Sequence, residues 1–289
     1  CNGTGRLYDY TLFPGIDLIF MDFNCSDTFH EPIPNKNIIE IRHYQKGRVE
    51  FELRNNKVFH MKEGEFCINA LANVPAAYSF PFGNSVGLSC VIDKDSVDSE
   101  TQQLFSYYNI DVLNLGRELE LEKKWFLCRT PQRLLHIFDE LYAAKGSEGR
   151  DYFRIKLLEL FYHIKQLRIE DQYEAPYYSK EQIEIIKRIR HKLIENLDKK
   201  ISIEELLQRE PMSKVTFQAI FKQIYGDTPY AHIKNYKMNL AAVYLQETDQ
   251  SITQIAGELG YSNISKFARA FQAVFGLLPK DYRKAKKTN

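Results

Sequence analysis

The feature that most constrains this 289-residue chain is an internal repeat in its last third. The stretch SIEELLQREPMSKVTFQAIFKQIYGDTP, residues 202–229, recurs as SITQIAGELGYSNISKFARAFQAVFGLLP, residues 251–279. Ser202 aligns with Ser251 at an offset of 49, whereas Phe217 aligns with Phe267 at an offset of 50, so the second copy holds one extra residue. Such repetition predicts one supersecondary unit that is used twice.

Each copy has the pattern of two short amphipathic helices joined by a tight turn. In the second copy, the first helix follows Ser251, a typical N-cap, ends at Gly260, and has apolar residues at helical spacing: Ile252, Ile255, Ala256 and Leu259. The next helix places Phe267, Ala270, Phe271 and Val274 on one face, and Ser265, Ala268, Arg269 and Gln272 on the other. One copy alone would favour an ordinary helical hairpin with a solvated charged face. Because the pattern occurs twice, we predict helix-turn-helix units whose second helices enter the DNA major groove.

The outward side chains of the two second helices are the candidates for reading bases. Arginine can bind guanine, glutamine can bind adenine, and a valine methyl can touch the thymine methyl. In the first copy the anchored face consists of Phe217, Ile220, Phe221 and Ile224. We predict base contacts from the opposite faces: Val215, Gln218 and Ala219 in the first copy, and Ser265, Lys266 and Arg269 in the second. Phosphate contacts are predicted for Lys222, and for Ser213 and Asn263 near the helix starts.

The segment between the copies, PYAHIKNYKMNLAAVYLQ, predicts one long helix from about 229 to 246. Pro229 suits the first helical position, and apolar residues follow at helical intervals: Ile233, Tyr236, Leu240, Val243 and Tyr244. At 1.5 Å per residue this helix is roughly 27 Å long. It could therefore hold two reading helices about one duplex turn apart, near 34 Å, so that one chain reaches two successive major grooves.

Residues from about 181 to 285 resemble the DNA-binding domain of the AraC/XylS family of bacterial transcription regulators. The second copy carries that family's pattern: Ile255-Ala256, the Gly-Tyr-Ser turn at 260–262, Phe-x-x-x-Phe, Gly-x-x-Pro and Tyr-Arg. The resemblance implies a sequence-specific regulator that binds double-stranded DNA, with RNA polymerase as a partner if it is an activator. The first copy departs from the pattern at REPMS, where Pro211 restricts Glu210, and at Ala219, where relatives often have a long polar side chain. The helix-turn-helix of the first copy is therefore expected to contact fewer bases directly.

The charge of the chain is divided between its two parts. Residues 176–289 hold 19 Lys+Arg and 12 Asp+Glu, a net of +7, which leaves 20 and 26, or −6, for residues 1–175. A basic C-terminal part suits a polyanion, whereas an acidic N-terminal part argues against nucleic acid there.

The N-terminal part is rich in short β-branched and aromatic runs. Strands are expected within residues 15–23, 37–53, 57–70 and 85–93, with hairpin turns at LRNNKVF and KEGEF. They indicate a small sandwich or barrel, and by resemblance the cupin-like sensor domain that many AraC-type regulators carry. A small-molecule effector could occupy it, with candidate pocket residues Tyr44, Phe51, Phe66 and Tyr78. At these spacings, however, such side chains more often form plain core.

Two amphipathic helices are expected between residues 131 and 168. Their apolar stripes are Leu134, Leu135, Phe138, Leu141 and Tyr142, followed by Phe153, Leu157, Leu158, Phe161, Ile164 and Leu167. In the resembled family helices in this place commonly form a homodimer; the alternative is that they only complete the core. The polar segment 169–179 has the composition of a linker.

The expected fold class is therefore α+β multidomain. Residues 1–93 would form the cupin-like β-barrel or sandwich, residues 94–175 the helical dimerisation element and linker, and residues 176–289 the all-α double helix-turn-helix domain.

Enzyme chemistry is not favoured, and we expect no cofactor or metal. The histidines of the β-rich part, His30, His43 and His60, lack the close His-x-His spacing of metal-dependent cupins. The GNSVG stretch around Ser85 matches a hydrolase nucleophile motif, but that motif needs a strand before the serine and a helix after it, so we expect Ser85 in a hairpin loop. Two alternatives stay open: a regulator without a ligand, whose barrel serves dimerisation or a protein partner, and a cupin-type enzyme fused to a DNA-binding domain.

Cysteine usage and hydropathy favour a cytoplasmic protein. The five cysteines, Cys1, Cys25, Cys67, Cys90 and Cys128, are odd in number and form no Cys-x-x-Cys pair, so reduced thiols are expected. No apolar run approaches the roughly 20 residues that span a bilayer. A first residue of Cys is typical of a mature lipoprotein, but we favour a chain without its first residues, because an exported DNA-binding domain has little use.

Overall fold

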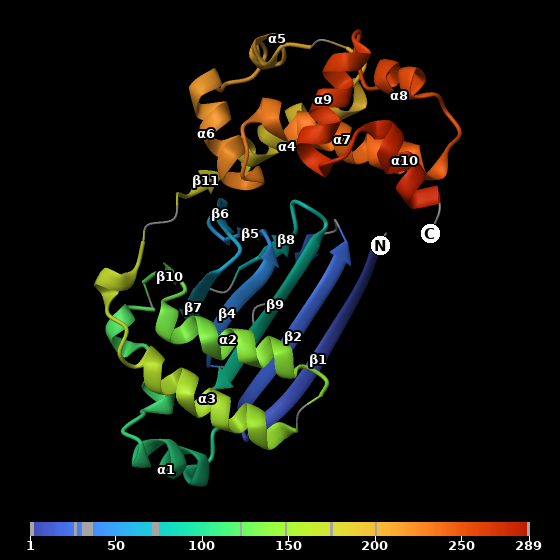
Figure 1. Ribbon diagram of the computed structural model, residues 1–289. Helices are drawn as coiled ribbons and strands as arrows, with labels where there is room; N and C mark the ends of the chain where they lie inside the picture. Colours follow the sequence, from blue (N-terminus) through green and yellow to red (C-terminus); the bar gives the residue numbers. More distant parts are fainter. Residues whose placement is uncertain are drawn as a thin grey trace. The chain divides into compact units, whose positions relative to one another are not determined.

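The computed structural model describes residues 3–25, 28–30, 37–70, 75–121, 123–147, 149–173, 176–199 and 201–287. The chain forms two compact units, Cys1–Lys180 and Glu181–Asn289, which are described separately below (Figure 1). The first unit is a β structure with helices, and in the second the described residues form helices and connecting turns but no strand. The predicted α+β multidomain fold class is therefore confirmed.

Two antiparallel sheets form the frame of the first unit. The larger sheet has the order β1 (Gly3–Phe13), β2 (Ile16–Cys25), β9 (Asn84–Asp93), β4 (Ile38–Gly47), β7 (Glu65–Ala70) and β10 (Phe126–Arg129). The smaller sheet has the order β11 (Tyr178–Ser179), β6 (Lys57–Met61), β5 (Val49–Glu52), β8 (Ala77–Ser79) and β3 (Thr28–His30).

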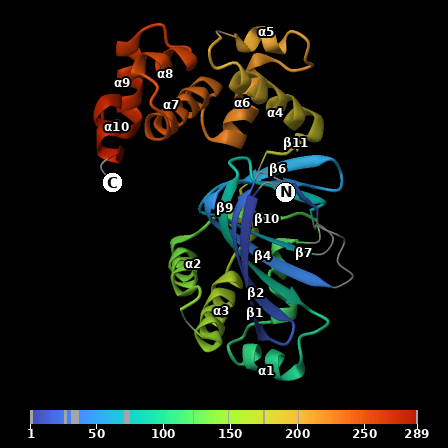
Figure 2. The ribbon, with the colours of Figure 1, turned by 90° about the vertical axis from the view of Figure 1, so that its right-hand side faces the viewer.

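Alternation along the strands of the larger sheet produces two hydrophobic cores. On β4, Ile39 and Ile41 belong to a helix-side core, whereas Tyr44 belongs to an inter-sheet core with residues of both sheets. Helices α2 (Gln132–Ala144) and α3 (Arg150–Ile164) lie side by side on one face of the larger sheet (Figures 1 and 2). Helix α1 (Ser99–Tyr107) contributes Phe105 to the same core. The helices after residue 93 thus share their core with the strands.

The structure confirms the four predicted strand regions and corrects several details. The LRNNKVF hairpin joins β5 to β6, and Leu53 N donates to Lys57 O at 2.7 Å. The hairpin prediction at KEGEF is wrong, because β6 and β7 belong to different sheets and Gly64, at φ 75°, lies at the corner between them. The supposed linker also contributes to the fold, since Tyr178 and Ser179 pair with β6.

The second unit consists of seven helices over its described residues. They are α4 (Lys180–Glu195), α5 (Ile203–Leu207), α6 (Lys214–Tyr225), α7 (Pro229–Glu247), α8 (Ile252–Glu258), α9 (Ile264–Phe275) and α10 (Pro279–Lys287). The predicted long helix between the two copies is α7, with Pro229 at its start and the Thr228 side chain accepting from Ala231 N. The two helix pairs α5–α6 and α8–α9 correspond to the two copies of the repeat.

Candidate nucleic-acid interface

The two helix pairs are built with the same capping groups. Ser202 and Ser251 each form a capping box at the start of the first helix, with Glu205 and Gln254 respectively. Each second helix ends at a glycine with positive φ, 84° at Gly226 and 75° at Gly276. A residue without Cβ adopts this conformation at little cost. Each glycine therefore ends its helix and directs the chain toward the next α-helix, which begins with a proline.

In α6 the predicted division into an anchored and an exposed face is present. Phe217, Ile220, Phe221 and Ile224 are at most 1% exposed. Val215 is 77% exposed, and Gln218, Ala219 and Lys222 are exposed as well. The side chains of this face are thus accessible to a binding partner.

In α9 the same division holds, with one correction. Phe267 and Phe271 are fully buried, and Ser265, Lys266 and Arg269 are exposed. Val274, which the sequence placed on the anchored face, is 40% exposed. Phe275 takes its place, because its ring lies 4.7 Å from that of Phe271 and 5.2 Å from that of Tyr282 on α10.

The two residues predicted to contact phosphate near the helix starts are N-caps. The Ser213 hydroxyl accepts from Thr216 N at 3.1 Å, and Asn263 Oδ1 accepts from Lys266 N at 3.0 Å. Both side chains are exposed at helix N-termini, where unpaired backbone N–H groups favour an anion. The Asn263 amide still has its N–H groups available for such a partner.

The unusual turn of the first copy is held by α4, a contact that the sequence did not predict. Glu210, which precedes Pro211, forms a two-bonded ion pair with Arg188: the Nε–Oε1 distance is 3.1 Å and the Nη2–Oε2 distance is 2.7 Å. Paired hydrogen bonds of this kind fix the relative orientation of the two groups. The start of α6 therefore has a defined position although the turn lacks the usual glycine.

Helix α7 uses a different face from the one that the sequence indicated. Its buried residues are Pro229, Met238, Ala241, Ala242 and Leu245, whereas Val243 is 42% exposed. The Tyr-Arg pair of the repeat also has a structural role: Arg283 Nη2 donates to Gln250 O at 2.7 Å, and Gln246 Nε2 donates to the Tyr282 hydroxyl at 2.9 Å. These bonds tie α10 to the end of α7.

In the first unit, three of the four candidate pocket residues are gathered in one place. Tyr44 and Phe51 belong to the inter-sheet core, and Tyr78 packs against it. Phe66 does not join them, because it lies in the helix-side core with Phe126 and Phe138.

A buried polar cluster lies beside these three rings. Arg42 lies over the rings of Phe51 and Tyr78 and is paired with Glu40 through an Nε–Oε1 distance of 2.7 Å. Ser89 Oγ donates to Glu40 Oε1 at 2.5 Å. Asn69, opposite Glu40 in the sheet, is fully buried, and its amide atoms have no hydrogen-bond partner among the described residues.

His43 and His60 make polar contacts within the first unit, and Ser85 lies in a strand. His60 is paired with Glu50 at 2.9 Å, and His43 Nδ1 lies 3.0 Å from the Tyr142 hydroxyl. No group of three or more His, Cys, Asp or Glu that could hold a metal is found among the described residues. Ser85 lies in strand β9 rather than in the expected hairpin loop, and it donates to Lys46 O at 3.5 Å.

The described cysteines have no disulfide bonds. Cys25, Cys67, Cys90 and Cys128 are buried as free thiols, and Cys1 lies outside the described residues. Burial raises the pKa of the Cys128 thiol to about 12, so this side chain is protonated at neutral pH. Within the described residues no helix combines the length and the apolar character that crossing a membrane requires.

Comparisons with known proteins match the second unit. A family model described as a helix-turn-helix domain covers residues 206–285. The regulatory protein SoxS of Salmonella typhimurium is 31% identical over 100 residues, which make up 35% of this chain and 94% of SoxS. The HTH-type transcriptional regulator AlkR of Acinetobacter baylyi is 34% identical over 86 residues, 30% of this chain but only 28% of AlkR.

The match is thus confined to a part of the longer relatives. The aligned residues span 28% of AlkR and 42% of the probable regulator LumQ of Photobacterium leiognathi. Among solved structures, ToxT of Vibrio cholerae is 12% identical, with a TM-score of 0.38 over 93% of this chain and 97% of that one.

Proposed function

Since the chain belongs to the AraC family of helix-turn-helix transcription regulators, we propose that it regulates transcription by binding double-stranded DNA through α6 and α9. The observation that carries this proposal is the pair of helices with the same design. Each buries two phenylalanines completely and exposes the opposite face at the same register of the repeat. Each face can enter one major groove, so one chain binds two successive turns of the duplex.

The exposed side chains divide into base and phosphate contacts. Arg269, Lys266 and Ser265 on α9, with Gln218, Val215 and Ala219 on α6, lie on the outward faces and are assigned to base edges. Lys222, Ser213 and Asn263 are assigned to phosphates. Helix α6 of the first repeat copy has fewer long polar groups on its exposed face than α9, so α9 is expected to supply most of the sequence preference.

Selection of bound sequences from random DNA, followed by footprinting, tests this proposal. We expect each bound chain to protect two major-groove segments whose centres are about 10 base pairs apart. The segment bound by α9 should show the stronger sequence preference. Binding without sequence preference, or protection of a single groove, would contradict it.

We further propose that a small molecule in the inter-sheet core of the first unit controls DNA binding. The support is the buried cluster of Arg42, Glu40, Ser89 and Asn69 beside the rings of Tyr44, Phe51 and Tyr78. A buried amide without partners is the kind of group that an enclosed ligand or water satisfies.

Thermal unfolding of the full chain with a panel of metabolites and metal ions tests the ligand proposal. A ligand that binds the folded state adds RT ln(1 + [L]/Kd), about 2.7 kcal/mol at a hundredfold excess over Kd. A rise that is lost in Asn69→Leu would place the ligand in this core. If no compound raises the unfolding temperature, the barrel serves assembly or a protein partner instead. As a regulator of this kind, the protein would act in the cytoplasm, and an activator would also contact RNA polymerase.

A further inference from the structure

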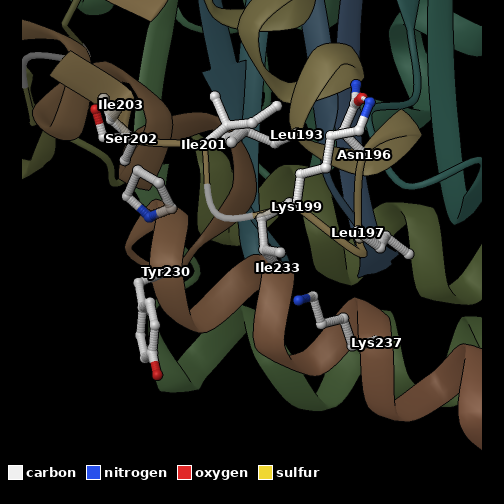
Figure 3. Close-up of a pocket in the computed structure, with 11 residues that line it drawn as sticks. Leu193, Asn196, Leu197, Lys199, Ile201, Ser202, Ile203, Tyr230, Ile233 and Lys237 are labelled. Carbon is white, nitrogen blue, oxygen red and sulfur yellow. Dashed lines mark hydrogen bonds between the residues drawn. The ribbon is translucent and has the colours of Figure 1, made fainter. Parts of the chain in front are cut away.

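The second unit contains a pocket of about 350 Å³ that the proposed DNA contacts do not use (Figure 3). Its lining residues come from the end of α4, from residues 196–199 and 201–203, and from the first half of α7, and none belongs to α6 or α9. This volume lies at the lower end of the range of small-molecule sites, roughly 300–1,000 Å³.

The walls of this pocket are mainly apolar. Leucine and isoleucine side chains from three segments provide most of the surface: Leu193, Leu197, Ile201, Ile203 and Ile233. Such a surface favours a hydrocarbon or aromatic body, because each buried apolar Å² contributes about 25 cal/mol.

Of the two ammonium groups in the pocket, one has no hydrogen-bond acceptor among the described residues. Lys199 donates to Asn196 Oδ1 at 3.0 Å, and Figure 3 shows its side chain extending toward Asn196. Lys237 forms no hydrogen bond or ion pair with any described residue, and its Nζ lies 5.7 Å from the centre of the Tyr261 ring. Burial lowers the pKa of Lys237, which is the sign of a charge that has lost water without gaining a counter-ion, although Asp198 opposes the shift from a distance.

We propose that this pocket binds a small amphipathic carboxylate. Its hydrocarbon part packs against the leucine and isoleucine walls, and its carboxylate pairs with Lys237 Nζ. An apolar body with a single negative charge matches both properties of the pocket, whereas a polyanion does not suit the apolar walls and a cation is repelled by the ammonium groups.

An occupant would touch the elements that position both helix-turn-helix units. Ser202 lines the pocket and caps α5 of the first copy, whereas Leu197 packs against the hydrophobic core of the second copy. The Leu197 carbonyl lies so close to the turn of the second copy that a Cβ at Gly260 would be 2.4 Å from its oxygen. Helix α7 joins the two helix pairs α5–α6 and α8–α9. A ligand in this pocket can therefore change the orientation of α6 relative to α9 and thereby the affinity for DNA.

Calorimetry on the full chain with octanoate tests the binding step. Octanol serves as the uncharged control of equal length, Lys237→Met removes the charge, and Lys234→Met on the same helix is the matched control outside the pocket. We expect octanoate to bind at least about tenfold more tightly than octanol, since a charge-assisted pair contributes about 1.4 kcal/mol or more. Lys237→Met should remove this preference and Lys234→Met should keep it. Ile233→Trp, which fills the pocket, should weaken both compounds.

Three results would overturn the proposal. They are equal affinities for octanoate and octanol, octanoate binding that survives both Lys237→Met and Ile233→Trp, and no binding to the full chain. The effect on DNA is measured separately, with saturating octanoate changing the affinity of the wild type and not that of Lys237→Met. That second readout rests on the proposed function, whereas calorimetry does not, so failure of DNA binding and failure of the pocket are distinguishable.

Discussion

Arg269 and Lys222 are exposed cations on the second helices of the two repeat copies, and we expect different consequences when each is removed. Arg269→Ala should relax the preference at one base position by about 1–3 kcal/mol, because a bidentate contact to guanine is lost. Lys222→Ala should weaken binding to all sequences alike and reduce the slope of log K against log salt by about one. Competition assays with single-base variants at several salt concentrations measure both effects. If the two variants change every position equally, the assignment is wrong.

The environment of His232 predicts that the stability of the second unit depends on pH. Burial and the neighbouring Arg190, which donates to His232 Nε2 at 3.0 Å, lower the pKa of His232 to about 4 from 6.5. The unfolded state therefore binds more protons between pH 6.5 and 4, so this contribution to stability is complete above pH 6.5 and falls as the pH drops through that window.

Denaturant unfolding at several pH values measures this contribution. After allowance for partial exposure of the ring, we expect the loss of unfolding free energy relative to pH 7 to reach roughly 2 kcal/mol at pH 4. His232→Gln, which still accepts from Arg190, should make the free energy of unfolding of this unit flatter than that of the wild type over the window. Equal pH dependence of the two proteins would show that His232 does not titrate as described.

At the scale of helices and strands, the sequence predicted most where one face of an element is apolar and the other polar. The 3.6-residue period correctly assigned Phe217, Ile220 and Phe221 to the anchored face of α6. In α7 the predicted helix is present, but the apolar positions named from the sequence do not form its fully buried face, because apolar residues occur all around the helix and tertiary packing selects Met238 and Ala241. The hairpin prediction at KEGEF was wrong because a glycine turn between two strands is compatible both with a hairpin and with a change of sheet, and the local sequence does not distinguish them.

The attachment of α10 to α7 is a prediction at this same scale. Arg283 donates to the carbonyl oxygens of Leu245 and Gln250 at 3.3 and 2.7 Å. Arg283→Ala leaves both acceptors without this donor, so we expect the second unit to lose about 1–2 kcal/mol of stability. Lys280→Ala, an exposed position on the same helix, should change it by less than about 0.5 kcal/mol. Urea unfolding of the full chain followed by circular dichroism compares the two, and equal losses would refute a specific role for Arg283.

At the scale of the whole molecule, the open question from the sequence was whether α2 and α3 dimerise or complete the core. Most of their apolar residues are committed to the helix-side core, including Phe138, Phe153 and Phe161. However, α3 also has apolar side chains on its outer side: Ile155 is 64% exposed and Tyr162 is 46% exposed, seven residues apart along the helix. Residues two turns apart share a face, so this strip can pair with its copy in a second chain.

We propose a homodimer through this strip, and Ile155→Glu tests it in the full chain. The carboxylate would be buried without a partner at the dimer interface, so we expect a shift from dimer to monomer in sedimentation velocity while cooperative unfolding of each chain is retained. Leu104→Glu on α1, where the leucine is 43% exposed, is the matched control and should leave the dimer intact. A wild type that is monomeric at all concentrations would mean that α2 and α3 serve the core alone. Since one chain already has two reading helices, such a monomer would still bind two successive grooves, and the footprint would show one pair of protected segments rather than two.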